Sequence, residues 1–203
     1  MTQTKNQEPK SPIQGRLIIG ISGASGAILA IRLLEILRPM PYETHLVISP
    51  AAHPTIIQET DWKVSDVLSL ADVTYSYQDI GARIASGSFS TLGMVVVPCS
   101  VKTLSAIANG YTDNLLARAA DVTLKEGRPL VLVFRETPLH RGHLRLMTLA
   151  AEAGAIIFPP LPAFYARPQT VDDLVTNLAG RILARLGVEN TAYLKWKEDI
   201  GNE

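Results

Sequence analysis

The sequence lacks most of the features that mark disulfide-rich, membrane-spanning or nucleic-acid-binding proteins. It has one cysteine among its 203 residues, which excludes a disulfide framework and a cysteine-rich zinc module. Lys plus Arg and Asp plus Glu number 19 each, and a chain without net charge is a poor sequence-independent ligand for nucleic acid or a membrane surface. No apolar run reaches the roughly 18 residues of a transmembrane helix, so no membrane span is expected.

The composition and the two ends of the chain indicate a single domain. Residues 1–14 are polar and lack the apolar core of a secretory signal, so we expect a cytoplasmic protein with a flexible arm at residues 1–15. A hydrophobic content of 47% allows a sizeable core, and no repeat or linker divides the chain. The prediction is one Rossmann-like domain at residues 16–187 with a tail at 188–203. Zero net charge with positive mean hydropathy also favours self-association.

Short apolar runs alternate with segments of helical periodicity along the chain. The runs show no polar alternation, which is typical of strands buried on both faces of a parallel sheet. The expected strands are residues 16–21, 44–48, 94–97, 130–134 and 155–158. The expected helices are 27–37, 50–59, 103–108, 114–125, 143–153 and 171–186, and residues 62–92 are irregular. This order predicts a three-layer α/β fold, flavodoxin-like or Rossmann-like, with helices on both faces of a parallel sheet.

The turn after the first expected strand, residues 20–26 (GISGASG), is rich in small residues and precedes a helix. Such a turn lets the backbone approach a ligand, and the helix start offers unpaired N–H groups to an anion. It has neither the Gly-Lys-Ser/Thr of a Walker loop nor a third glycine at the spacing of the dinucleotide fingerprint. Phosphate binding is favoured over a tight turn that only packs the helix on the sheet.

Polar or charged residues also follow the next strands. Ser49 ends the second strand, and taken alone it is best explained as a helix cap. Residues 100–103 (SVKT) place two hydroxyls and an ammonium at another helix start. The pair Arg135–Glu136 follows the LVLVF strand, and alone it is best explained as a solvated salt bridge. Because the carboxyl ends of parallel strands share one edge, the set as a whole indicates an anion site there.

The single cysteine, Cys99, and the four histidines carry no catalytic or metal pattern. A lone cysteine beside a buried strand is most often a small core hydrophobe, and a catalytic thiolate needs a cationic partner that the sequence does not place. His140 and His143 can share a helix face, but no carboxylate completes a zinc signature. We therefore expect no metal site, and surface or core positions for the histidines.

Several separated motifs, in order, resemble the UbiX/Pad1 family of flavin prenyltransferases. They are GISGASGA, SPAA with ETD, SGSF, PCSVKTLSAIA, RAADVTLKE, RPLVLVFRETPLH and PPLPAFYARPQTVDDL. The resemblance extends from about Arg16 to Leu186. It implies a flavodoxin-like, FMN-binding domain, a homododecamer, and transfer of a dimethylallyl group from dimethylallyl monophosphate to N5 and C6 of reduced FMN without a metal. The implied product is the prenylated-FMN cofactor of UbiD-type decarboxylases, including one in ubiquinone synthesis.

The resemblance also implies roles for individual residues. The FMN contacts would be Gly23, Ala24, Ser25, Ser49, Ser100, Val101, Lys102, Thr103 and Arg135. The prenyl phosphate would be held by Tyr165, Arg181, Arg118 and Lys125, and the catalytic set would be Glu59, Lys125, Glu136, Ser25 and Tyr165. Two positions depart from the family pattern, Pro50 in place of a lysine and Gly127 in place of an arginine, and both put local geometry in doubt rather than the activity.

The chemistry of the implied reaction agrees with these residue types. A monophosphate that leaves without a metal needs fixed cations and hydrogen-bond donors, and arginine offers bidentate geometry to phosphate oxygens. On an isolated helix, Arg118, Lys125 or Arg181 would be an ordinary solvated side chain, and Tyr165 a surface plug of the core.

Two alternatives stay open at the level of sequence. An FMN-dependent cysteine-type decarboxylase shares this fold, but it uses a catalytic histidine in an early helix and an Asn-containing turn where this chain has residues 98–103. A non-catalytic FMN carrier needs only the turns at the strand ends, and it would leave Arg118, Lys125, Glu136, Tyr165 and Arg181 without a role.

Overall fold

The computed structural model describes residues 13–196 of the 203, and it contains one six-stranded sheet. The strand order is β3-β2-β1-β4-β5-β6, and every pairing is parallel. The strands are β1 (Gly15–Ile21), β2 (Tyr42–Ile48), β3 (Val73–Tyr75), β4 (Gly93–Cys99), β5 (Leu130–Phe134) and β6 (Ile156–Ile157). The order reverses between β1 and β4, so the two central strands lead to connections that leave the sheet on opposite sides.

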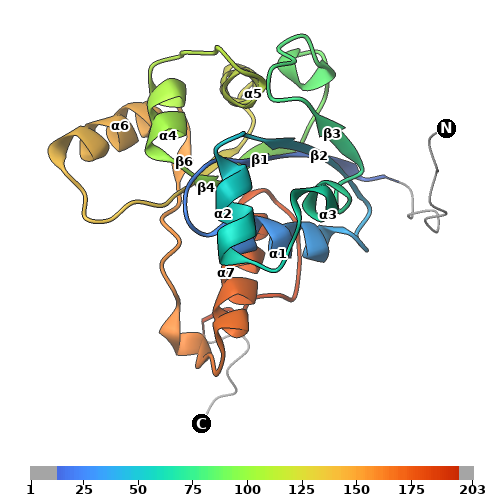
Figure 1. The fold of residues 1–203 in the computed structure, drawn as a ribbon, viewed down its shortest axis with the longest axis vertical. Helices are drawn as coiled ribbons and strands as arrows, with labels where there is room; N and C mark the ends of the chain where they lie inside the picture. The colour runs from blue at the N-terminus through green and yellow to red at the C-terminus, as the bar shows by residue number, and fades with distance from the viewer. Residues whose placement is uncertain (1–12, 197–203) are drawn as a thin grey trace.

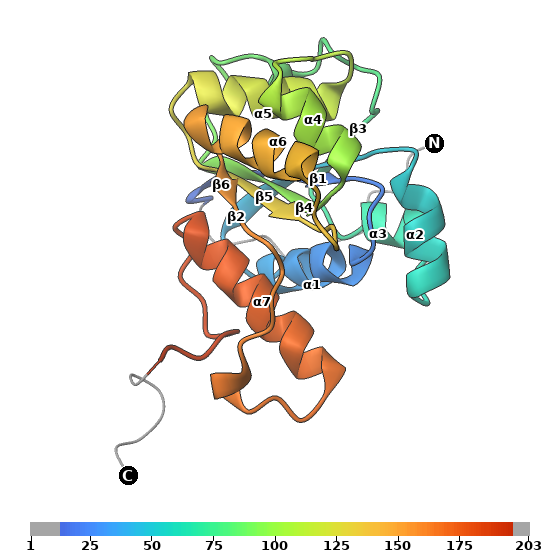
Figure 2. The same ribbon diagram turned by 90° about the vertical axis from the view of Figure 1, so that its left-hand side faces the viewer.

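The helices form one layer on each face of the sheet, as Figures 1 and 2 show. One layer holds α1 (Ala27–Leu37) and α7 (Val171–Arg185), with α2 (Ala52–Glu59) and α3 (Val64–Leu68) beside α1. The other holds α4 (Val101–Ala108), α5 (Leu115–Lys125) and α6 (Arg141–Glu152). Two short 3-10 helices, η1 (Arg83–Ala85) and η2 (Phe164–Ala166), lie in the connections. The predicted three-layer α/β fold is confirmed.

Alternate residues of the central strands supply two separate apolar clusters, one on each face. In β1, Leu17, Ile19 and Ile21 join the cluster under α1 and α7, whereas Ile18 joins the one under α4 and α5. All seven residues of β4 are buried. Burial on both faces explains why these strands are continuously apolar.

Most expected elements agree with the structure, and the exceptions have identifiable causes. Residues 62–92 contain α3, β3 and η1, which are too short for a periodic pattern to reveal them. The expectation that Ser49 and Pro50 begin a helix is wrong: α2 begins at Ala52, its N-cap is Ala51, and no side chain caps it. The domain boundaries stay a prediction, since residues 1–12 and 197–203 lie outside the described part of the chain.

The departure at Gly127 has a local explanation. Gly127 follows the C-cap of α5 with a φ of 65°, in the left-handed region that glycine adopts without strain. Between residues 13 and 196, no helix is long and apolar enough to cross a membrane.

The start of α7 is attached to α1 by an exposed ion-pair network. Arg32 of α1 donates to Asp172 at 3.0 Å and also contacts Thr176. Thr170 and Asp173 form a reciprocal capping box at the same helix end. These contacts determine where the loop that carries η2 joins the body of the domain.

His45, in the middle of β2, is a fully buried polar residue on the α5 side of the sheet. Its Nδ1 lies 2.9 Å from the hydroxyl of Tyr75, and its Nε2 lies 3.0 Å from Oε1 of Glu43. Phe89 packs edge-on against the imidazole ring. His45 is therefore a core histidine, one of the two kinds of position expected for the histidines.

Burial lowers the pKa of His45; Arg16 and Arg83 act in the same direction, and Glu43 opposes them. The unfolded chain protonates this residue near its ordinary value of about 6.5, so it binds more protons than the folded chain just below that pH. Stability is therefore present above about pH 6.5 and decreases as the pH falls toward the lower, folded pKa.

We expect His45→Gln to reduce the slope of unfolding free energy against pH by up to about one proton below about pH 6.5. Urea denaturation at several pH values measures this slope, and exposed His53→Gln is the matched control. An unchanged slope in His45→Gln would contradict the prediction.

Candidate functional site

The loops that follow β1, β2, β4 and β5 surround one cavity of about 500 Å³ at the carboxyl edge of the sheet. It lies beside the point where the strand order reverses, the usual ligand position in open parallel sheets. The cavity contains ten of the residues predicted for the site: Gly23, Ala24, Ser25, Ser49, Ser100, Val101, Lys102, Thr103, Arg135 and Glu136.

The glycine turn after β1 is closely packed against the start of α2. A Cβ on Gly23 would lie 2.6 Å from the Cβ of Ala51 and 2.7 Å from its carbonyl oxygen, so only glycine fits here. Gly26, the N-cap of α1, has a φ of 103° and provides no side-chain cap. The first turn of α1 therefore keeps backbone N–H groups available beside Ser25.

Glu59, at the end of α2, reaches the start of α1. Its Oε2 accepts a hydrogen bond from the backbone N–H of Gly26 at 2.8 Å. This position is favourable for a carboxylate because the helix start carries a partial positive charge. Glu59 does not line the cavity itself, but it contacts the residue directly after Ser25.

Ser49 is 5% exposed, and within the described residues its Oγ has no hydrogen-bond partner. Its backbone N–H donates to Ile21 at 2.9 Å, so the residue is fixed while the hydroxyl is not. A buried hydroxyl without a partner is costly unless a ligand supplies one. Helix capping, the explanation favoured for Ser49 alone, is therefore wrong, and the free hydroxyl fits a bound polar ligand.

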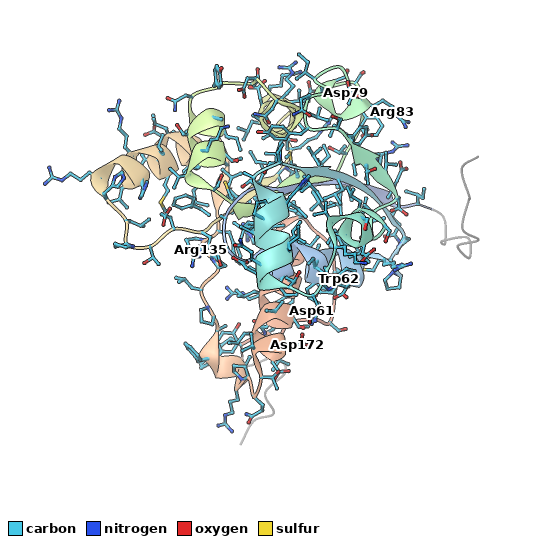
Figure 3. All side chains as sticks on the ribbon, viewed as in Figure 1. Asp61, Trp62, Asp79, Arg83, Arg135 and Asp172 are labelled. Atoms are coloured by element: carbon cyan, nitrogen blue, oxygen red, sulfur yellow. The ribbon has the colours of Figure 1, made fainter. Side chains whose placement is uncertain are left out.

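Two cations, Lys102 and Arg135, lie on the cavity wall. Ser100 caps α4 by accepting from the backbone of Thr103 at 3.3 Å, which places Lys102 in the exposed first turn. Arg135 directly follows β5, and Figure 3 shows it between α2 and the connection to α6. Neither Lys102 nor Arg135 makes an ion pair with any residue between 13 and 196. Both charges are available to an anion.

Glu136 lines the same cavity and is half-buried. Its Oε1 accepts a hydrogen bond from the backbone of Thr137 at 3.0 Å. No ion pair joins it to Arg135 in the described chain, so the salt-bridge explanation of this pair is wrong. A carboxylate and two unpaired cations therefore share one wall.

Arg118 and Lys125, both on α5, lie outside this cavity. Arg118 pairs with Asp121 at 2.8 Å, and Lys125 contacts Glu126 at the end of the helix. The start of α5, with Asn114, lines a neighbouring cavity of about 320 Å³, and Lys125 is at the opposite end of the helix. At about 1.5 Å per residue, an eleven-residue helix separates its ends by about 15 Å.

Tyr165 and Arg181 belong to a third region. The hydroxyl of Tyr165, in η2, donates to the carbonyl of Leu194 at 3.2 Å, and its ring contacts Trp196 edge-on at 5.2 Å. Arg181 is on α7 and, like Tyr165, does not line the cavity. Within one protomer, the four predicted phosphate ligands therefore do not line the cavity.

Three cavity residues were absent from the predicted set: Pro50, Ala51 and Tyr77. Tyr77 also borders the neighbouring cavity, and burial and Asp113 raise its pKa. It lies in the irregular region 62–92, where the sequence has no periodic signal. Pro50 departs from the family pattern, so the motif comparison did not select it.

Cys99 is a core residue, as predicted. It is fully buried, and burial raises the pKa of its thiol far above the ordinary value, so no thiolate nucleophile is available. The His140 and His143 rings stack at 3.6 Å, and His140 accepts a hydrogen bond from Gly142 at the start of α6.

Comparison with known proteins agrees with this geometry. A family model described as Flavoprotein matches residues 4–183. The flavin prenyltransferase UbiX of Escherichia coli K12 is 61% identical over 185 residues, which cover 90% of this chain and 98% of that protein. The chain belongs to the flavin prenyltransferase family. The predicted family resemblance is confirmed, and both alternatives drawn from the sequence are disfavoured.

Two solved structures of the family extend the comparison. AnUbiX (PadA1), in complex with FMN and dimethylallyl pyrophosphate, is 46% identical with a TM-score of 0.89, covering 93% of this chain and 99% of that one. A dodecameric, FMN-dependent UbiX-like decarboxylase of Escherichia coli O157:H7 is 50% identical with a TM-score of 0.87, covering 90% and 99%. The predicted flavoprotein fold and FMN cofactor are supported by these relatives.

Proposed function

We propose that this prenyltransferase moves a dimethylallyl group from dimethylallyl monophosphate to N5 and C6 of reduced FMN. The observation that carries the proposal is the cavity at the carboxyl edge, where the unpartnered Ser49 hydroxyl and the unpaired Lys102 and Arg135 lie together. These groups fit a flavin that carries a phosphate. When bound, reduced FMN supplies the nucleophilic ring atoms for the transfer.

The residues of the four loops provide different groups for binding the flavin. Gly23, Ala24 and Ser25 offer backbone N–H groups and a hydroxyl at the start of α1, and residues 100–103 offer the same at the start of α4. Ser49 supplies a hydroxyl, and Arg135 supplies a guanidinium. The turns at Gly23–Ser25 and Ser100 present backbone and short side chains to the cavity, and these lose little side-chain freedom when a ligand binds.

Glu136 and Glu59 are proposed to act near the departing phosphate. A carboxylate beside a phosphate is unfavourable unless one of them holds a proton or cations lie between them. Glu136 meets this condition beside Arg135, and in our proposal it exchanges a proton with the phosphate as the bond to the prenyl group breaks. Glu59 holds the first turn of α1 through Gly26 and so supports Ser25.

The remaining proposed ligands reach the cavity from other copies of the chain. Arg118 and Lys125 on α5, and Tyr165 and Arg181 near α7, do not line the cavity of their own protomer. Exposed Phe164 (71%), Leu161 (70%) and Trp196 (60%) surround the Tyr165 region, which is consistent with a covered apolar surface. We propose a homo-oligomer, a dodecamer, in which neighbouring copies complete each phosphate site.

The product of this reaction is a prenylated flavin, and a UbiD-type decarboxylase is the proposed recipient. The cytoplasm is the proposed location. Transfer without a metal requires the phosphate charge to be neutralised by protein cations, which Lys125, Arg118 and Arg181 supply.

We expect that protein incubated with FMN, dithionite and dimethylallyl monophosphate yields a flavin heavier by one isoprene unit. Mass spectrometry of the released flavin measures this directly, and a parallel reaction with the diphosphate tests the donor. Omission of the reductant is the control and should give no product. Bound FMN of unchanged mass with either donor would indicate a carrier and contradict the transferase.

We expect Glu136→Gln to retain FMN binding and to slow prenylation by about 10²-fold or more, as for loss of an acid–base group. Stopped-flow absorbance of reduced flavin at saturating substrates measures the rate. Exposed Glu152→Gln, at the end of α6, is the matched control. If Glu136 only shapes the wall of the FMN cavity, FMN affinity will fall while the rate at saturation is retained, which would remove Glu136 from the catalytic set.

A shared site predicts complementation between two inactive variants. Glu136→Gln and Lys125→Ala, each strongly impaired alone, are expected to recover activity when co-expressed with different tags and purified as mixed oligomers. Random mixing brings the two intact residues together at about a quarter of the sites. Activity no higher than that of the parents would contradict a site completed by neighbouring copies.

A further inference from the structure

Ser22 joins the ends of the two central strands through its side chain. It is 1% exposed, and its Oγ donates to the carbonyl of Pro98 at 2.9 Å while accepting from the backbone N–H of Ser100 at 2.8 Å. The Ser22 backbone N–H also reaches the Pro98 carbonyl at 3.2 Å. The regular pairing of β1 with β4 stops at Gly20 and Val96, so Ser22 continues the connection beyond the ladder.

The two segments joined by Ser22 are the two helix-start turns of the cavity. The glycine turn begins at the next residue, Gly23, and Ser100 is both the N-cap of α4 and the first residue of the turn that carries Lys102. The Ser22 hydroxyl donates its only proton to Pro98 and accepts from Ser100, and at 1% exposure it is closed off from a ligand. Ser22 therefore affects the cavity by holding the two turns at a fixed spacing.

Removal of this hydroxyl would leave the Ser100 N–H without its acceptor. That N–H precedes the first turn of α4, whose start offers donors to an anion, and a small displacement there changes the geometry around the anion. The turn after β2 is attached at the same place, because the backbone N–H of Ser49 donates to the carbonyl of Ile21, the neighbour of Ser22. Ser22 thus lies between the turns that follow β1, β2 and β4, although it does not line the cavity itself.

We propose that Ser22 is a positioning residue for the phosphate of FMN, which sets the distance between the α1 and α4 turns. The proposal rests on the FMN contacts of the proposed function. Because it concerns the phosphate, it predicts a different effect on FMN than on riboflavin, which has the same ring and no phosphate. A general loss of stability would weaken both ligands together.

The test compares Ser22→Ala with Thr123→Ala in titrations of FMN and riboflavin by flavin fluorescence. Thr123 is also 1% exposed, and its hydroxyl donates to Ala119 at 2.7 Å on α5, away from the cavity. We expect Ser22→Ala to raise the dissociation constant of FMN by about tenfold or more, and to change that of riboflavin by less than about twofold. Thr123→Ala should leave both constants near the wild-type values.

The proposal is overturned if Ser22→Ala binds FMN like the wild type, if FMN and riboflavin weaken equally, or if Thr123→Ala weakens FMN as much. Should Ser22→Ala not fold, Ser22→Cys replaces the hydroxyl with a weaker acceptor of similar shape, and the same selective loss of FMN is expected. Wild-type protein that does not bind FMN would overturn the proposed function as well, whereas normal FMN binding with an unaffected Ser22→Ala overturns this inference alone.

Discussion

The parallel pairing of β1 with β4 is the constraint on which the rest of the structure depends. Successive connections leave these neighbours in opposite directions, toward β2 on one side and β5 on the other. The loops therefore separate at the carboxyl edge and leave room for a ligand. Ser22 and Gly23 provide the close approach there, one through hydrogen bonds to the β4 segment and the other by having no side chain against Ala51.

The electrostatics of the cavity follow from the same arrangement. The whole chain has no net charge, so an anion site must be made by local placement of cations and helix starts. Lys102 and Arg135 have no counter-ion in residues 13–196, while Arg32, Arg118 and Lys125 are each paired on helices elsewhere. Unpaired cations beside two helix starts make this edge attractive to a phosphate.

In a single copy of the chain, the cavity at the carboxyl edge does not include the four proposed phosphate ligands Arg118, Lys125, Tyr165 and Arg181. The helices that carry those ligands, α5 and α7, lie on opposite faces of the sheet (Figure 2). Lys125 is at the end of α5 that lies away from the neighbouring cavity beside Asn114, and the proposed homo-oligomer would bring it to the site of another copy. The exposed apolar residues near η2 are consistent with such a neighbour.

The sequence by itself determined the three layers, the carboxyl edge of the sheet as the place of the site, and most of the residues that line the cavity there. The buried strand Leu130–Phe134 is a continuous apolar run, the helix Ala27–Leu37 has helical periodicity, and strand ends in a parallel sheet share an edge. Only the tertiary structure decided that Ser49 has a free hydroxyl, that Tyr77 reaches the cavity, and that Lys125 does not. Hydrogen-bond satisfaction and distance depend on how remote segments pack, and local sequence patterns contain no information about that packing.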